Sequence, residues 1–475
     1  MKALASVIAN TRKQTSYCHF NRIIFGLIWP QMSSIKRIRL PFAVMVIMLI
    51  INVMYSKAQD WPQFLGPDRN STSPQKGLLR SWPESGPEVL WSVNIGIGFG
   101  GPVAKNGKVY FLDRDEEVGD MMRCFDLQTG KELWKFGYGA PGTFPFPGSR
   151  SVPIVDDRHV YSCGPNGDLY CIDIQTHEPV WNKNVWTDFG GEKLPTWGIA
   201  QCPVFYGDLL LVASQTSQTG VVAYNKLTGD VVWKTPSLGP VGYSNPKVVK
   251  IDGDDQIVYI TSSISSRGGT QAIMGNVVGM EPRTGRILWQ YSNWDCSAQV
   301  PCAVDAGDNR LLICGELRAT LLKVNKKADG TYEASVIFTS EEFGDETKTP
   351  IFHNGYFYAM HRAVSKREGL VCMDMEGKIM WKTRRNPNFD FGSMLLADGL
   401  MIANDGFKTI YLIQPDPTAF KPVSKDELLR EGGGATEGME RMIESSTQNY
   451  APIALADGKL LIRDQNRMLC VKVTE

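Results

Sequence analysis

The chain is 475 residues long, and its 50 basic and 50 acidic side chains leave no formal net charge. This balance argues against the basic face that nucleic-acid binding requires. The length alone would suit two or three ordinary domains, so the internal pattern of the sequence has to decide the fold.

The first part of the chain has the features of a secretory signal. Residues 40–54 are an apolar run, apart from Asn52, that follows a basic segment at 36–39 and precedes the small residues Ser56 and Ala58. Because fifteen residues are short for a membrane span, we predict cleavage after Ala58, with an uncleaved anchor as the alternative.

Residues 1–58 are therefore taken as a signal-peptide region, in which Met32 is the better start. They hold eight basic residues and no acidic ones, so their removal leaves 42 basic and 50 acidic side chains, a formal charge of −8. We expect an exported protein, periplasmic or extracellular, that is monomeric and has no stable membrane span after processing.

Residues 59–87 are rich in Pro, Gly and Ser and are predicted to form an extended arm with turns. Residues 88–93 are then predicted to form a single strand around Trp91, with no neighbouring segment of the sequence to pair with it. At the other end of the chain, residues 468–473 form a third strand that lacks a fourth. We predict that these two segments pair and close a ring, which removes exposed sheet edges.

Between these segments a hairpin motif recurs, as in RCFDLQTGKELW at 123–134. Its copies end at Trp134, Trp181, Trp233, Trp289 and Trp381, with a looser copy ending at Phe338. The position four before the Trp is Gly130, His177, Gly229, Gly285 or Gly377. A tight hairpin needs a positive φ, which Gly adopts at little cost, and Trp suits the sealing of one sheet against the next.

A second element alternates with this motif: an apolar strand, a polar turn and another apolar strand. Seven of its eight copies open with a proline, from Pro102 to Pro452, at intervals of about 50 residues. Each repeat holds one Trp hairpin and one copy of this second element, so it has four strands, which is the composition of a propeller blade. We therefore predict an all-β, eight-bladed β-propeller of four-stranded antiparallel blades over residues 88–475, closed by the N-terminal strand in the last blade.

Blade seven departs from the pattern. Residues 409–420 keep the strand but lose the Thr-Gly turn and the Trp, and the insertion at 421–449 is the longest connection. Within it, SKDELLRE, starting at Ser424, has helix-forming composition, and residues 436–446 could form a second short helix.

Nine cysteines follow the signal region. Cys124, Cys171, Cys372 and Cys470 recur in the third strand of their blades, which favours a packing role for a small apolar side chain. Cross-strand disulfides, Cys163 with Cys171 and Cys302 with Cys314, are an alternative that an exported chain permits. No spacing of Cys and His indicates structural zinc or c-type haem, so no metal site is predicted.

Other polar residues are assigned structural roles. Asp252, Asp254 and Asp255 crowd one turn, which is interpreted as solvated. Four histidines, His159, His177, His353 and His361, lie in or beside strands and turns. No Ser-His-Asp arrangement or phosphate-binding Gly loop is discernible.

A ligand site is predicted where the connections between blades converge on a central funnel. The candidate residues there are Arg150, Trp197, Gln201, Asn245, Trp294, Gln299, Lys348, Asp390 and Asn449. They combine aromatic, amide and charged groups, which suits a polar ligand or a peptide. In the alternative interpretation, the amides only cap strand ends.

The Trp motif resembles the repeats of pyrroloquinoline quinone (PQQ) dehydrogenases and of the outer-membrane assembly propeller lipoprotein. The opening WPQFLGPDRN and the ending PIALADGKLLIRD resemble exported bacterial PQQ-binding-like propellers. This resemblance implies the eight-bladed fold. In the dehydrogenases it also implies a quinone above the ring with Ca²⁺, an Asp base and, in the alcohol dehydrogenases, adjacent cysteines, which this chain lacks.

Two functions follow from the resemblance. The favoured one is a non-catalytic binding or scaffold module for a protein, peptide or glycan at the funnel rim. The other is a PQQ- and calcium-dependent oxidoreductase of alcohols or sugars, for which Trp197 or Trp294 would have to stack on the quinone.

Overall fold

The computed structural model describes residues 59–265, 272–363, 366–430 and 448–475. The chain divides into two units, Met1–Lys57 and Ala58–Glu475, and all the described strands belong to the second. The predicted signal region and most of the insertion, including the second predicted helix, lie outside the described residues.

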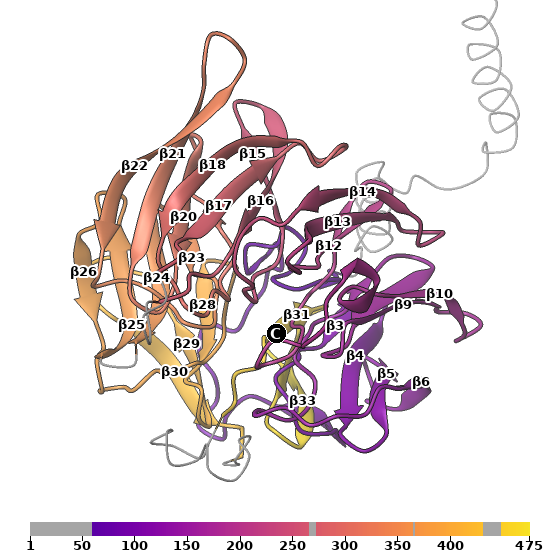
Figure 1. The fold of residues 1–475 in the computed structure, drawn as a ribbon. Helices are drawn as coiled ribbons and strands as arrows, with labels where there is room; N and C mark the ends of the chain where they lie inside the picture. The colour runs from indigo at the N-terminus through magenta and orange to yellow at the C-terminus, as the bar shows by residue number, and fades with distance from the viewer. Residues whose placement is uncertain (1–58, 266–271, 364–365, 431–447) are drawn as a thin grey trace, which may run out of the picture. The chain divides into compact units, whose positions relative to one another are not determined.

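Eight antiparallel sheets surround a common centre (Figure 1). Blade 1 consists of β3 (Val103–Lys105), β4 (Lys108–Asp115), β5 (Gly119–Asp126) and β6 (Glu132–Gly139). Blade 2 consists of β7 (Ile154–Val155), β8 (His159–Cys163), β9 (Asp168–Asp173) and β10 (Pro179–Asn184). Blade 3 consists of β11 (Val204–Tyr206), β12 (Leu209–Ala213), β13 (Thr219–Asn225) and β14 (Val231–Pro236). Blade 4 consists of β15 (Lys247–Ile251), β16 (Asp254–Ile260), β17 (Gly275–Met280) and β18 (Ile287–Trp294).

The second half of the ring repeats this order. Blade 5 consists of β19 (Val304–Asp305), β20 (Arg310–Cys314), β21 (Ala319–Lys326) and β22 (Tyr332–Ser340). Blade 6 consists of β23 (Ile351–His353), β24 (Tyr356–Ala363), β25 (Lys366–Asp374) and β26 (Ile379–Lys382). Blade 7 consists of β27 (Met394–Ala397), β28 (Leu400–Asn404), β29 (Thr409–Ile413) and β30 (Pro422–Glu427), with β1 (Thr72–Ser73) added beside β27. Blade 8 consists of β31 (Ala454–Ala456), β32 (Lys459–Arg463), β33 (Arg467–Lys472) and β2 (Val89–Asn94).

The first strand of each blade is its inner strand. Inner strands of neighbouring blades contact one another, as β31 does β3 and as β23 does β27. The only helical segment in the described residues is the short 3-10 helix η1 (Thr187–Phe189). The all-β, eight-bladed prediction is thus confirmed.

The recurring Trp and Gly contact each other across blade boundaries. Gly229 has a φ of +73°, and a Cβ added to it would stand 2.7 Å from the indole of Trp181 in the preceding blade. The Trp181 indole N–H also donates to the carbonyl of Lys226 in the same turn, at 3.0 Å. Where His177 replaces the glycine, its ring stacks on Trp134 at 4.9 Å between centroids. The Trp of each of these blades therefore packs against the hairpin turn of the next blade.

The recurring cysteines lie directly opposite the Trp residues. Cys124 pairs with Trp134 and Cys470 pairs with Trp91 in the strand register. In blade 4 the same position is Gly279, where an added Cβ would stand 2.0 Å from the Trp289 ring. Only a small side chain fits under the indole, which explains the cysteines as packing residues.

The alternative of cross-strand disulfides is wrong for this structure. All nine described cysteines are buried free thiols. In the β8–β9 hairpin Cys163 pairs with Leu169, whereas Cys171 pairs with Tyr161, so the two sulfurs do not face each other.

Ring closure follows the prediction. The strand β2 pairs antiparallel with β33, with Trp91 opposite Cys470 and Val93 opposite Met468. Blade 8 is therefore built from both ends of the described chain, and its outer edge strand comes from the N-terminal side.

The helix predicted from Ser424 is wrong. Residues 422–427 form β30, the fourth strand of blade 7, and Ser424 pairs with Leu412 of β29. The backbone hydrogen bonds that β29 offers outweigh the weak helix preference of this segment.

Residues 59–87 lie against the inner strands. Trp61 forms a bridge with Ala104 in blade 1, and the carbonyl of Pro62 accepts the Val155 amide of blade 2 at 3.0 Å. Further along, β1 runs parallel to β27 of blade 7. This arm (residues 59–87) therefore crosses the centre of the ring before it continues into β2.

Candidate functional site

The two faces of the ring are not equivalent. On one face, here called the 1–2 rim, lie the turns that join the first and second strands, and the arm contacts these turns. Asp60 of the arm accepts the Asn106 amide, and Asp398 accepts the amides of Gly77 and Leu78. The opposite face, the 4–1 rim, carries the connections from the last strand of one blade to the inner strand of the next.

All nine predicted site residues belong to the 4–1 rim, in or immediately before these connections. Six of them are buried: Gln201, Asn245, Trp294, Gln299, Asp390 and Asn449. The other three are half-buried: Arg150, Trp197 and Lys348.

The buried amides join neighbouring connections. Gln201 donates from Nε2 to the carbonyl of Ser244 at 2.8 Å, and Asn245 accepts the amide of Cys202 at 2.5 Å. Gln299 accepts the indole N–H of Trp294 at 2.7 Å and donates to the carbonyl of Pro301 at 2.7 Å. These side chains fix the shape of the rim from beneath.

Aromatic rings line the rim in two contiguous groups. In the first group, Phe391 contacts Tyr450 at 4.7 Å, Tyr450 contacts Phe99 at 5.7 Å, and Phe99 contacts Phe146 at 6.0 Å between ring centroids. These four half-buried rings come from the connections that enter blades 7, 8, 1 and 2.

The second group is Trp197 and Tyr243, which enter blades 3 and 4 and whose centroids lie 5.0 Å apart. Arg150 joins the groups, because it donates to the carbonyl of Trp197 and, at 2.5 Å, to that of Phe146. We call these six rings the aromatic arc: Phe391, Tyr450, Phe99, Phe146, Trp197 and Tyr243.

Sequence reasoning found only Trp197 among the six rings. The other five carry a weak signal, which is an aromatic residue within eight positions before an inner strand. The sequence of one connection does not predict that its aromatic ring contacts the ring of the next connection.

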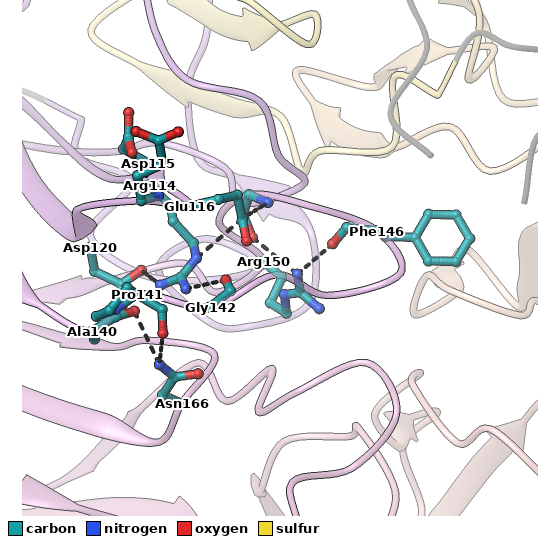
Figure 2. Close-up of polar contacts among 12 residues, drawn as sticks. Arg114, Asp115, Glu116, Asp120, Ala140, Pro141, Gly142, Phe146, Arg150 and Asn166 are labelled. Carbon is teal, nitrogen blue, oxygen red and sulfur yellow. Dashed lines mark hydrogen bonds and ion pairs between the residues drawn. The ribbon is translucent and has the colours of Figure 1, made fainter. Parts of the chain in front are cut away.

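A buried ionic network supports the loop at 140–150 that carries Phe146 (Figure 2). Arg114 lies 2.9 Å from Asp120 and 3.2 Å from Glu116, and it donates to the carbonyl of Gly142 at 2.8 Å. Glu116 in turn accepts the amide of Gly148 at 2.5 Å. In Figure 2 the Phe146 ring points away from this network.

Burial shifts the pKa values of this network. Desolvation raises the pKa of Asp120 to about 6, although the neighbouring Arg114 acts in the opposite direction. Desolvation also lowers the pKa of Arg150 to about 10. Both guanidinium groups lie over the Phe144 ring, at 5.7 Å for Arg114 and 4.6 Å for Arg150.

A second pair of ionisable groups, the buried Asp345 and the half-buried Lys348, lies on the connection into blade 6. Burial raises the pKa of Asp345 and lowers that of Lys348, which neighbours it in space. Asp345 accepts the amides of Thr347 and Lys348 at 2.9 and 2.8 Å, so its carboxylate organises this turn.

The resemblance to PQQ dehydrogenases implies a quinone and a calcium ion above the ring. Calcium needs several converging oxygen ligands. Within residues 59–265, 272–363, 366–430 and 448–475, no group of three or more His, Cys, Asp and Glu side chains could hold a metal ion. Glu116 and Asp120, the carboxylates beneath the Phe146 loop, are bound by Arg114. This donor set does not fit a calcium-bound quinone.

Comparisons with known proteins agree with this architecture. A family model described as outer membrane protein assembly factor BamB matches residues 118–295, from blade 1 to the end of blade 4. A solved structure, quinohemoprotein alcohol dehydrogenase from Comamonas testosteroni, covers 90% of this chain and 82% of its own, with a TM-score of 0.62 and 13% identity. That likeness shows the fold alone. The chain is a PQQ-like β-propeller protein.

The sequence relatives of this PQQ-like propeller include both an enzyme and an assembly factor. Tetrathionate hydrolase of Acidithiobacillus ferrooxidans is 26% identical over 202 residues, which are 40% of this chain and 38% of that protein. Outer membrane protein assembly factor BamB of Shewanella oneidensis is 23% identical over 263 residues, 44% of this chain and 62% of that protein. The chain thus spans less than two thirds of the length of either relative. In the described part of the propeller, no helix is long and apolar enough to cross a membrane.

Proposed function

We propose that this protein is an exported, non-catalytic propeller that binds a protein or peptide segment on its 4–1 rim. The aromatic arc is the observation that carries the proposal. Its rings are half-buried, so each is held in place and still presents surface.

The chemistry of the arc favours a peptide. Aromatic rings offer large, rigid contact area at a low cost in side-chain entropy, which is why they dominate protein recognition sites. Arg150 lies within the arc, between Phe146 and Trp197, and its positive charge would suit acidic or carbonyl groups of a bound segment. The relative named as an assembly factor of outer membrane proteins supports a protein partner.

The network beneath Phe146 would keep the site preorganised. Arg114, Glu116 and the Gly148 amide fix the loop before any ligand arrives, so little ordering entropy remains to be lost on binding.

The aromatic arc is tested by panning a random-peptide phage library against the parent protein and two variants. We expect Phe99→Ala/Tyr450→Ala to weaken selected peptides by about tenfold or more, since a lost aromatic anchor costs about 1–2 kcal/mol or more. Tyr291→Ala, a half-buried ring on the outer strand β18, is the matched control and should bind like the parent.

Enzymatic and glycan-binding functions are tested in parallel. Titration with PQQ and Ca²⁺, followed by dye reduction with alcohols and aldoses, should show no stoichiometric uptake. Uptake with substrate-dependent dye bleaching would replace our proposal with the dehydrogenase function, and selective retention on a glycan array would replace the peptide. Export is checked by the intact mass of the mature protein, which should begin near Gln59.

A further inference from the structure

A cavity of about 410 Å³ opens on the 1–2 rim between blades 3, 4 and 5. The turns that join third and fourth strands share this rim, because the strands of a blade alternate in direction. Blade 4 contributes its acidic segment 252–255 and its turn at 281–286, and blade 5 contributes the long hairpin between β21 and β22, which projects from the ring in Figure 1. The volume is within the range of small-molecule sites, which is roughly 300–1,000 Å³.

The acidic segment 252–255 organises the cavity. Its Asp254 carboxylate accepts the ammonium of Lys326 at 2.7 Å and the hydroxyl of Tyr332 at 2.6 Å, both on Oδ2. Hydrogen bonds from Lys326 and then from Tyr332 lower the pKa of Asp254, so this group is ionised at neutral pH. The interpretation of the segment as a solvated turn is therefore incomplete, because Asp254 also binds the hairpin of blade 5 to blade 4.

Asp255 fixes the second tyrosine of the lining. It accepts the ammonium of Lys250 at 2.7 Å and the hydroxyl of Tyr206 at 3.2 Å. The guanidinium of Arg283 lies 5.2 Å from the centroid of the Tyr206 ring. Tyr206 and Tyr332 are both half-buried and bound through their hydroxyl groups, so their rings are positioned before a ligand arrives.

The charges of the lining balance. Three acidic and three basic side chains line the cavity: Asp254, Asp255, Glu281, Lys250, Arg286 and Lys326. An anion would therefore approach three carboxylates, and a cation would approach three positive groups. A neutral ligand with several hydroxyl groups fits better, because hydroxyl groups both donate to carboxylates and accept from ammonium and guanidinium groups.

Two polar groups of the lining remain available for such a ligand. No described residue forms a hydrogen bond or ion pair with Oδ1 of Asp254 or with the guanidinium of Arg286, which lies on the exposed turn of blade 4. The first group is an acceptor and the second is a donor, and the tyrosine rings of the same lining offer flat apolar faces. This combination is typical of a site for a sugar, whose ring has polar edges and apolar faces.

We propose that this cavity binds a neutral saccharide. Asp254 would accept a hydrogen bond from a sugar hydroxyl, Arg286 would donate one, and the rings of Tyr206 and Tyr332 would pack against the faces of the sugar. The lining contains no residue of the arm or of the aromatic arc. The site therefore does not depend on the peptide-binding proposal.

A glycan array that carries neutral and acidic glycans, probed with the mature protein, tests the proposal. We expect selective retention on neutral glycans, and the best of them is then titrated by calorimetry. Tyr332→Ala should weaken its binding by about tenfold or more, and Arg286→Gln by about three- to tenfold. The matched controls lie outside the lining and should bind like the parent: Tyr291→Ala, a half-buried ring of β18, and Arg310→Gln, a cation at the first turn of blade 5.

Arg286→Gln keeps the test decisive if Tyr332→Ala folds poorly, because Arg286 is exposed. No retention on any glycan, retention on acidic glycans alone, or unchanged binding by Arg286→Gln and Tyr332→Ala would each overturn the proposal. Loss of glycan binding in Phe99→Ala/Tyr450→Ala, with binding kept in Arg286→Gln, would assign the glycan to the aromatic arc and would also overturn it. Glycan binding that persists in Phe99→Ala/Tyr450→Ala and weakens in Arg286→Gln supports this cavity and leaves the peptide proposal intact.

Discussion

At the scale of single residues, the contact between a Trp and the turn glycine of the next blade connects the sequence repeat to the ring. Gly130 accommodates Trp91, Gly229 accommodates Trp181, and Gly377 accommodates Phe338. Each glycine has a positive φ and an aromatic ring against its Cα. Glycine is therefore required for two reasons: its backbone adopts this conformation at little cost, and it has no Cβ to collide with the ring.

Gly229→Ala separates these two requirements when it is compared with Gly253→Ala. Both glycines have a positive φ, +73° and +84°, but an added Cβ meets Trp181 at 2.7 Å in the first and nothing within 4 Å in the second. We expect a loss of unfolding free energy of about 2–4 kcal/mol for Gly229→Ala and of about 1 kcal/mol for Gly253→Ala, measured by urea denaturation. Equal losses would show that the Trp contact contributes nothing.

At the scale of elements, the loop at 140–150 depends on a buried carboxylate. Asp120 lies 2.9 Å from Arg114, and both side chains are fully buried. Because the folded state raises the pKa of Asp120 to about 6, the proton on this group stabilises the fold below the ordinary pKa, and that stabilisation is lost as the pH rises from about 4 to about 6.

Asp120→Asn tests this pH dependence. The neutral amide of the variant has no proton to lose. From pH 4 to pH 7 the free energy of unfolding of the parent should therefore fall by about 1–3 kcal/mol relative to that of the variant. Urea denaturation at both pH values measures the difference. Asp126→Asn is the control, since this half-buried carboxylate has a lowered pKa and should give no such fall. A constant difference between parent and Asp120→Asn would contradict the raised pKa.

At the scale of the whole molecule, the N-terminal segment acts in two separable ways. The strand β2 completes blade 8, whereas the arm packs Trp61, Leu78 and Trp82 into the cluster that also contains Trp91 and Val471. Loss of β2 leaves an open sheet edge, while loss of the arm removes buried apolar contacts, the pairing of β1 with β27 and the carbonyl groups that accept hydrogen bonds from Lys247.

Two truncated proteins distinguish these roles. A chain that begins at residue 88 keeps all eight blades and should unfold cooperatively at a melting temperature several degrees below that of the parent, because the four buried apolar side chains of the arm are lost, Trp61, Leu65, Leu78 and Trp82. A chain that begins at residue 96 lacks β2 and should show no cooperative transition by circular dichroism. Parent-like melting of the shorter chain would contradict closure by β2.

The sequence by itself determined the ring. The number of blades, the Trp and Gly contacts and the pairing of β2 with β33 follow from short patterns that repeat along the chain, because each blade is folded by local hairpins. The tertiary structure decided the rest. The six rings of the aromatic arc come from six connections spread between Phe99 and Tyr450, and the meeting of Arg69 with Lys247 joins the arm to blade 4. SKDELLRE, starting at Ser424, has helix-forming composition, yet its first four residues belong to the strand β30 because β29 presents an open edge beside them. The six rings and the Arg69–Lys247 contact join segments that lie far apart in the sequence, so no local pattern predicts them, and only the folded ring brings the partners together.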